Sequence, residues 1–125
     1  MKKRKTFGKA TQELREQLGS RKVLLEGNRK FMASFDSSKL SFEYDALIRA
    51  RVDSDVGVVL KLANAYKVPV TARGTGTSLT GSASPVRGGW VLDMTLMKRI
   101  AIRKEKAMVV VQSGAVVSDI QAAAD

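Results

Sequence analysis

The chain has 125 residues, which suffices for one domain with a buried core. It contains no cysteine and no histidine, which excludes disulfides, histidine-ligated zinc, cysteine nucleophiles and serine–histidine triads. Its net charge is +10, from 22 basic and 12 acidic residues, and the excess is concentrated in the first 30 residues, which hold ten basic and three acidic side chains.

The basic start, Met1–Lys5, is similar in charge to the first part of a signal peptide, but no apolar stretch follows it. Nothing approaches the ~18 apolar residues of a membrane span, so we expect a cytoplasmic protein. No helix-turn-helix, zinc-finger or RNA-recognition pattern accompanies the basic residues. We therefore favour a solvated tail over a nucleic-acid partner, and a peripheral contact with an anionic membrane stays open.

The first predicted element is a short amphipathic helix. Ala10, Leu14 and Leu18 recur at a spacing of four, and Gly19 ends the pattern. Residues 26–45 show no periodicity and are interpreted as irregular. We thus expect residues 1–40 to be a basic helical or irregular lead-in, and residues 41–125 to be the main folded unit.

A βαβ unit is predicted next. The apolar residues 46–48 form a strand, Asp53 or Ser54 caps a helix, and Pro69 ends that helix. Residues 70–72 form the second strand. A strand, helix and strand within about 30 residues indicate a parallel pair with a right-handed crossover.

Three further strands and a helix follow. Residues 90–94 form one strand, and residues 100–102 and 108–111 form an antiparallel hairpin around a charged turn. The last helix begins near Val116 and shows no stop signal before Asp125. We therefore expect a truncated chain, a fragment of a longer protein or one half of a split enzyme.

The segment most informative about function is the loop after the second strand, rich in glycine, serine and threonine. Gly74 and Gly76 allow close approach of a ligand, and successive amides can form an anion-binding nest. Thr75, Thr77 and Ser78 add hydroxyl groups, and Arg73 adds a permanent cation at the base. These are the groups that a phosphate or pyrophosphate requires. The competing interpretation is a flexible surface loop.

Two common phosphate motifs do not fit this loop. The Rossmann fingerprint needs a third glycine where Leu79 stands. The P-loop needs a lysine where Ser82 follows Gly81. The loop is therefore a phosphate cradle of another type.

The loop and its flanks carry a family resemblance. The matching segments are Arg73-Gly74-x-Gly76-Thr77-Ser78-x-x-Gly81, Asp53-Ser54-Asp55-Val56, Val68-Pro69-Val70, Pro85, Gly88-Gly89, Val91-Leu92-Asp93 and Gln112-Ser113-Gly114-Ala115. They resemble FAD-linked oxidases of the vanillyl-alcohol oxidase superfamily, in the branch that contains D-lactate dehydrogenase and one of the subunits of glycolate oxidase. The resemblance covers residues 35–125, and it departs from the family at Ala50 and Ser113, where proline is usual.

The resemblance implies an α+β fold: the N-terminal half of a PCMH-type (p-cresol methylhydroxylase-type) FAD-binding domain, with a small parallel βαβ core followed by hairpin strands. It implies FAD as cofactor, no metal, and a 2-hydroxy acid such as D-lactate or glycolate as substrate of the complete enzyme, to which a partner chain could supply the missing half. The implied cofactor-binding residues are Arg73, Gly74, Thr75, Gly76, Thr77, Ser78 and Gly81. No catalytic residue is assigned, and we expect this chain to be inactive alone. The alternative is a basic anion- or nucleic-acid-binding module without redox activity.

Four other residues have both a structural and a functional interpretation. Tyr44, Tyr66 and Trp90 could stack on a ring, but each lies in an apolar pattern that predicts packing. Asp93 could be a general base, but its position at a strand end favours a turn residue.

Overall fold

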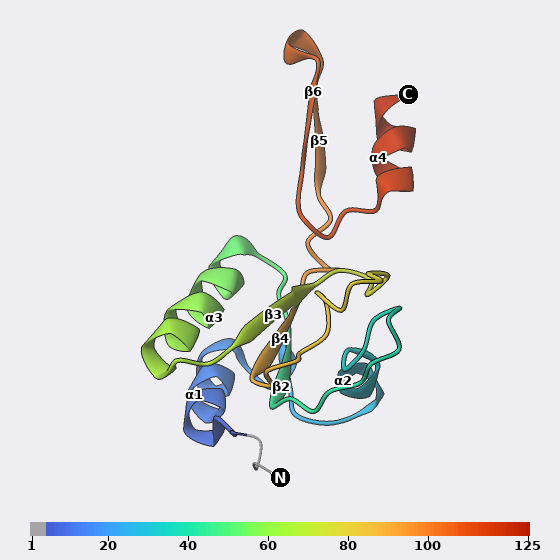
Figure 1. Ribbon diagram of the computed structural model, residues 1–125. Helices are drawn as coiled ribbons and strands as arrows, with labels where there is room; N and C mark the ends of the chain where they lie inside the picture. Colours follow the sequence, from blue (N-terminus) through green and yellow to red (C-terminus); the bar gives the residue numbers. More distant parts are fainter. Residues whose placement is uncertain (1–4) are drawn as a thin grey trace.

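The computed structural model describes residues 5–125, so residues 1–4 of the basic start lie outside the described part. Figure 1 shows a twisted sheet flanked by helices, with a hairpin that projects away from it. The elements are α1 (Gly8–Leu18), β1 (Val23–Leu24), α2 (Asn28–Met32), β2 (Ala46–Arg49), α3 (Asp53–Tyr66), β3 (Val70–Arg73), β4 (Trp90–Asp93), β5 (Ile100–Arg103), the 3₁₀ turn η1 (Lys104–Lys106), β6 (Met108–Val111) and α4 (Val117–Ala124). The predicted α+β class is confirmed.

The main sheet has four strands in the order β1-β2-β4-β3. β2, β4 and β3 are parallel, whereas the short β1 pairs antiparallel with β2. The predicted direct pairing of the strands that flank α3 is wrong, because β4 lies between them and hydrogen-bonds to both. The two strands are parallel members of one sheet, but they are not neighbours.

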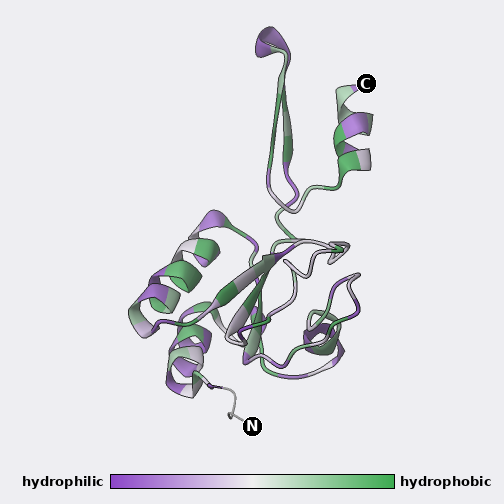
Figure 2. Cartoon of the chain, in the orientation of Figure 1, coloured by the Kyte–Doolittle hydropathy of each residue, from purple (hydrophilic) through white to green (hydrophobic). Residues whose placement is uncertain are grey.

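Both faces of this sheet are covered. On one face α1 and α3 pack against Ile48, Trp90 and Leu92, all of which are buried. On the other face the segment that contains α2 covers Leu47 and Val91. The first three residues of β2 and of β4 are accordingly apolar and buried, as is usual for parallel strands covered on both sides, whereas the edge strand β3 is only partly buried. In Figure 2 the hydrophobic residues of α1 and α3 face inward.

The helix α1 confirms the first predicted element, because Ala10 and Leu14 are buried, Leu18 is partly buried, and Gly19 follows the last turn. Its contact with α3 makes it part of the same core as the sheet. The prediction of irregular structure over residues 26–45 is wrong at α2, a five-residue helix.

Helix α3 already begins at Asp53, so neither Asp53 nor Ser54 caps it. Instead Asp55 reaches back, and its Oδ2 accepts from the backbone N–H groups of Arg51 at 2.9 Å and Val52 at 3.3 Å. The predicted cap is therefore wrong, although Asp55 does place negative charge in the first turn. The helix ends at Tyr66, before Pro69, as predicted.

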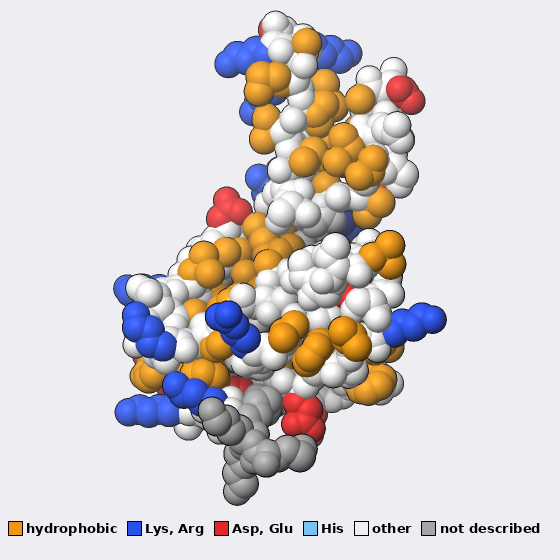
Figure 3. Space-filling model, in the orientation of Figure 1, with side chains coloured by type: hydrophobic (Ala, Val, Ile, Leu, Met, Phe, Trp, Pro, Cys, Tyr) orange, Lys and Arg blue, Asp and Glu red, His pale blue; other side chains and the backbone are white. Residues whose placement is uncertain are grey.

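The predicted hairpin is confirmed, with Ile100 opposite Val111 and Arg103 opposite Met108. It stands apart from the main sheet with α4 beside it (Figure 1), and all four residues of β6 are exposed. Figure 3 shows hydrophobic side chains gathered over this arm. No helix within residues 5–125 has the length and apolar character needed to cross a bilayer.

A close approach of backbone fixes the arm to the body. The N–H of Gly114 donates to the carbonyl of Met97 at 2.8 Å. A Cβ atom at Gly114 would lie 1.8 Å from the carbonyl oxygen of Met94. Only glycine fits here, because the neighbouring atom belongs to backbone rather than to a movable side chain.

Candidate functional site

The candidate site lies at the carboxyl ends of the three parallel strands. Arg49, Asp93 and Arg73 stand in register across β2, β4 and β3. Arg49 Nε pairs with Asp93 Oδ2 at 3.3 Å, and the N–H of Thr95 donates to Asp93 Oδ1 at 2.8 Å. Asp93 is thus held at the end of its strand, where the chain turns, as predicted. Ligands of open parallel sheets bind outside this edge.

The glycine-rich loop leaves the sheet at this edge, directly after Arg73. Gly74, Thr75 and Gly76 line a cavity of about 950 Å³, a size typical of small-molecule and cofactor sites. Gly76 has φ 76°, in the left-handed region that favours glycine, and Gly81 has φ 77°. The first residues of the loop therefore present backbone, with little side-chain bulk, to the cavity.

The outer part of the loop is arranged differently. Ser78 Oγ lies 3.0 Å from both Thr80 Oγ1 and Ser82 Oγ, so these hydroxyl groups satisfy one another. Thr77 is exposed. Neither Thr77, Ser78 nor Gly81 lines the cavity in the described structure.

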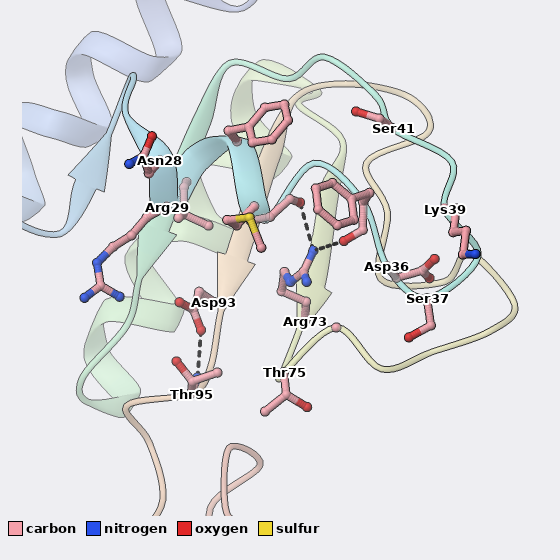
Figure 4. Close-up of a pocket in the computed structure, with 17 residues that line it drawn as sticks. Asn28, Arg29, Asp36, Ser37, Lys39, Ser41, Arg73, Thr75, Asp93 and Thr95 are labelled. Atoms are coloured by element: carbon pink, nitrogen blue, oxygen red, sulfur yellow. Dashed lines mark hydrogen bonds between the residues drawn. The ribbon is translucent and has the colours of Figure 1, made fainter.

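The opposite wall of the cavity comes from α2 and residues 33–41. Phe31, Met32 and Phe35 supply apolar surface, and Arg29 and Lys39 supply positive charge. Figure 4 shows this wall facing the start of the glycine-rich loop. The cavity therefore combines exposed amides, cations and aromatic surface.

The side chain of Arg73 lies against the start of the loop at Gly76 and reaches the opposite wall. Its Nη1 donates to the carbonyl of Ala33 at 2.9 Å and to the carbonyl of Phe35 at 2.8 Å (Figure 4). A longer contact, 3.5 Å, joins Nη1 to the carbonyl of Ala83. The guanidinium thus joins the two walls of the cavity.

Asp36 lies in a turn within this opposite wall, where its carbonyl accepts from the N–H of Lys39 at 3.1 Å. Its Oδ1 accepts from the N–H of Ser38 at 2.8 Å. The hydrogen bond from the Ser38 side chain is the main cause of a lowered pKa of Asp36, and it outweighs the burial that acts in the opposite direction. Asp36 Oδ2 and, at the end of the loop, Ser84 Oγ are buried without a hydrogen-bond partner among residues 5–125.

The structure brings together some of the predicted site residues. Arg73, Gly74, Thr75 and Gly76 line one cavity, whereas Thr77, Ser78 and Gly81 lie on the outer loop. The wall formed by residues 28–41 was not predicted from the sequence. α2 is too short for its apolar residues to show a period.

The aromatic residues pack as predicted. Trp90 is fully buried, and Tyr44 is buried with its hydroxyl group donating to the carbonyl of Lys30 at 2.5 Å. Burial raises the pKa of Tyr44, the positive charge of Arg73 opposes this rise, and Asp93 adds to it. Neither residue lines the cavity beside the glycine-rich loop.

Comparison with known proteins places these features in a family. The family described as FAD binding domain matches residues 44–125. A D-lactate dehydrogenase of Anaerostipes hadrus is 36% identical over 77 residues, which are 61% of this chain and 16% of that protein. The glycolate oxidase protein GlcD of Bacillus subtilis is 29% identical over 121 residues, which are 88% of this chain and 25% of that protein.

A solved structure shares the fold at higher coverage. The crystal structure of p-cresol methylhydroxylase with substrate bound superposes with a TM-score of 0.77 and 28% identity, over 94% of this chain and 24% of that chain. The chain spans a quarter or less of the length of these three proteins.

Proposed function

Because the chain belongs to the family of FAD binding domains, whose cofactor is FAD, we propose that its glycine-rich loop holds the pyrophosphate of that cofactor. The observation that carries the proposal is the position of Gly74–Gly76: backbone at the carboxyl edge of a parallel sheet, open to a cavity of about 950 Å³. The other members of the proposed cofactor-binding set are Arg73, Thr77, Ser78 and Gly81.

The described residues fit such a ligand. The amides of the loop suit the anionic pyrophosphate, and Arg29, Lys39 and Arg73 make the surrounding surface positive. Phe31 and Phe35 offer apolar surface of the kind that covers a flat ring. When bound, FAD supplies hydride-accepting chemistry, and the protein contributes binding, orientation and charge.

We also propose that the redox reaction served by this site is the oxidation of a 2-hydroxy acid such as D-lactate or glycolate. The support is the names of the relatives, a D-lactate dehydrogenase and a glycolate oxidase protein. Two carboxylates line the cavity among residues 5–125. Asp93 is held by Arg49 and Thr95, whereas Asp36 accepts from Ser38 with Oδ1 and leaves its buried Oδ2 without a hydrogen-bond partner.

A single substitution tests the loop. A Cβ atom at Gly74 would meet nothing within 4 Å, and the φ of Gly74 is not positive. Gly74→Glu should therefore fold normally while placing a carboxylate in the cavity. We expect FAD binding to weaken ~10-fold or more, because each ~1.4 kcal/mol changes the Kd tenfold.

The matched control is Gly57→Glu on α3, which makes the same change of charge at an exposed glycine with equally open surroundings. Binding is measured by calorimetric titration of each purified protein with FAD. A wild-type chain without affinity for FAD, or equal affinities for Gly74→Glu and wild type, would contradict the loop assignment.

A further inference from the structure

The role of Arg73 can be taken further, on the premise that the loop holds the cofactor. We infer that, within the proposed cofactor-binding set, Arg73 is a positioning residue: it fixes the shape of the loop by tying it to residues 33–35, and it acts on the pyrophosphate through the loop backbone. The first observation is the direction of the side chain. Its Nη1 is already engaged by the carbonyls of Ala33 and Phe35, at 2.9 and 2.8 Å.

The second observation is the contact between Arg73 and Gly76. A Cβ atom at Gly76 would lie 1.7 Å from Arg73 Nη2 and 2.8 Å from Cζ. The loop backbone is therefore folded directly against the guanidinium group. A side chain at Gly76 could be accepted only if the guanidinium moved, and that movement would break its hydrogen bonds to the opposite wall.

The third observation is a contact between Arg73 and the far end of the loop. Arg73 Nη1 also approaches the carbonyl of Ala83 at 3.5 Å. One side chain thus contacts the turn at residues 33–35, the start of the loop and its end. All three carbonyls are approached by Nη1, while the rest of the planar guanidinium group lies against Gly76.

Two substitutions of Arg73 distinguish a role through the shape of its side chain from a role through its charge. Lysine keeps the positive charge of Arg73, but it has a single terminal nitrogen and no planar group for Gly76 to pack against. If Arg73 acted through charge, Arg73→Lys would bind FAD like the wild type. If it acts through position, Arg73→Lys and the uncharged Arg73→Gln should fail alike.

The first experiment measures loop shape without cofactor, by hydrogen–deuterium exchange of the purified chain. We expect both Arg73 variants to speed exchange of the amides of residues 74–84 and 33–36, while β2 and β4 keep wild-type protection. Arg87→Lys, at an exposed arginine near the end of the same loop, is the control and should leave exchange unchanged. Wild-type exchange of residues 74–84 in Arg73→Lys would overturn the inference.

The second experiment measures FAD affinity in a double-mutant cycle of Arg73→Gln and Gly76→Ala. Each hydrogen bond to a charged group contributes enough that losing the tie should weaken binding about tenfold. Gly76→Ala should weaken binding severalfold more in the wild-type background than in Arg73→Gln, where the guanidinium is gone. If Gly76→Ala weakened FAD binding by the same factor in both backgrounds, the inference would be overturned.

The two experiments distinguish this inference from the proposed function. Absence of FAD binding by the wild-type chain would contradict the loop's role as a cofactor cradle, yet the exchange result would still decide whether Arg73 fixes the loop. Wild-type affinity in Arg73→Lys would leave the cradle intact and assign Arg73 a role through charge.

Discussion

Trp90 and Thr11 lie 79 positions apart in the chain, yet the indole Nε1 of Trp90 donates to Thr11 Oγ1 at 2.9 Å. Both side chains are buried. Thr11 Oγ1 in turn donates to the carbonyl of Phe7 at 2.7 Å. This chain of hydrogen bonds joins the first helix to the central strand of the sheet, so residues 7–18 are part of the folded body.

Thr11→Val should destabilise the protein by about 1–3 kcal/mol, because it leaves the buried indole N–H of Trp90 without an acceptor. The measurement is urea unfolding followed by the fluorescence of Trp90, the only tryptophan. Thr11→Ser keeps the hydroxyl group and should recover most of the stability. Equal losses in the two variants would assign the effect to packing instead.

Asp55→Asn should remove an acid-sensitive part of the stability. Burial opposes the charged form of Asp55, but hydrogen bonds from Lys22 and from the backbone N–H groups of Arg51 and Val52 outweigh it and lower its pKa. Lys22 Nζ lies 2.8 Å from Asp55 Oδ1. A lowered folded-state pKa stabilises the native state above the unfolded value of ~3.9, and this contribution is lost as the pH falls.

We therefore expect the free energy of unfolding of the wild type to decline more steeply than that of Asp55→Asn as the pH falls below ~4. At neutral pH the variant should be less stable by about 1–3 kcal/mol. Chemical denaturation at a series of pH values provides both quantities. Parallel curves for the two proteins would show that Asp55 is not the group responsible.

Gly114→Ala and Gly57→Ala should have opposite effects on stability. At Gly114 the new methyl group would meet the carbonyl of Met94, and overpacking of this kind costs about 1–3 kcal/mol. At Gly57, inside α3, nothing lies within 4 Å, and alanine in a helix is favoured over glycine by about 0.5–1 kcal/mol. Thermal unfolding of the two variants compares the same chemical change at a tight and an open position. A loss of stability in both variants would contradict the open surroundings of Gly57.

The tyrosines should resist ionisation at alkaline pH. Burial raises the pKa of Tyr44, and a hydrogen bond from the Tyr66 hydroxyl to Glu13 raises that of Tyr66. A raised tyrosine pKa stabilises the native state below the unfolded value of ~10, and this contribution is lost as the pH rises. Ultraviolet titration should therefore show tyrosinate appearing above ~10 in the native protein, and near ~10 in urea. Coincident curves would contradict the burial of Tyr44.

The sequence predicted the parts of the fold that depend on local pattern. The strands at residues 46–49 and 70–73 follow from apolar runs bounded by polar or proline positions, and Pro69 limits the length of α3. The strand order could not be predicted in this way. The insertion of β4 between β2 and β3 depends on contacts between distant residues, such as Trp90 with the α1 side of the core.

The sequence predicted one wall of the candidate site, the glycine-rich loop, but not the wall opposite it. The loop was visible because glycine and hydroxyl residues cluster after a strand. The wall that contains Phe31 and Phe35 carries no period and no motif, and it reaches the loop through tertiary contacts such as those of Arg73. The direction of the Arg73 side chain is likewise a property of the folded state.

The position of β4 has a consequence for synthesis of the protein. β4 is the strand that hydrogen-bonds to both β2 and β3. These two strands therefore cannot be joined into one sheet before residues 90–93 have left the ribosome. The chain between β3 and β4 contains the glycine-rich loop. The parallel sheet and the cavity at its edge are therefore incomplete until residues 90–93 are free to pair.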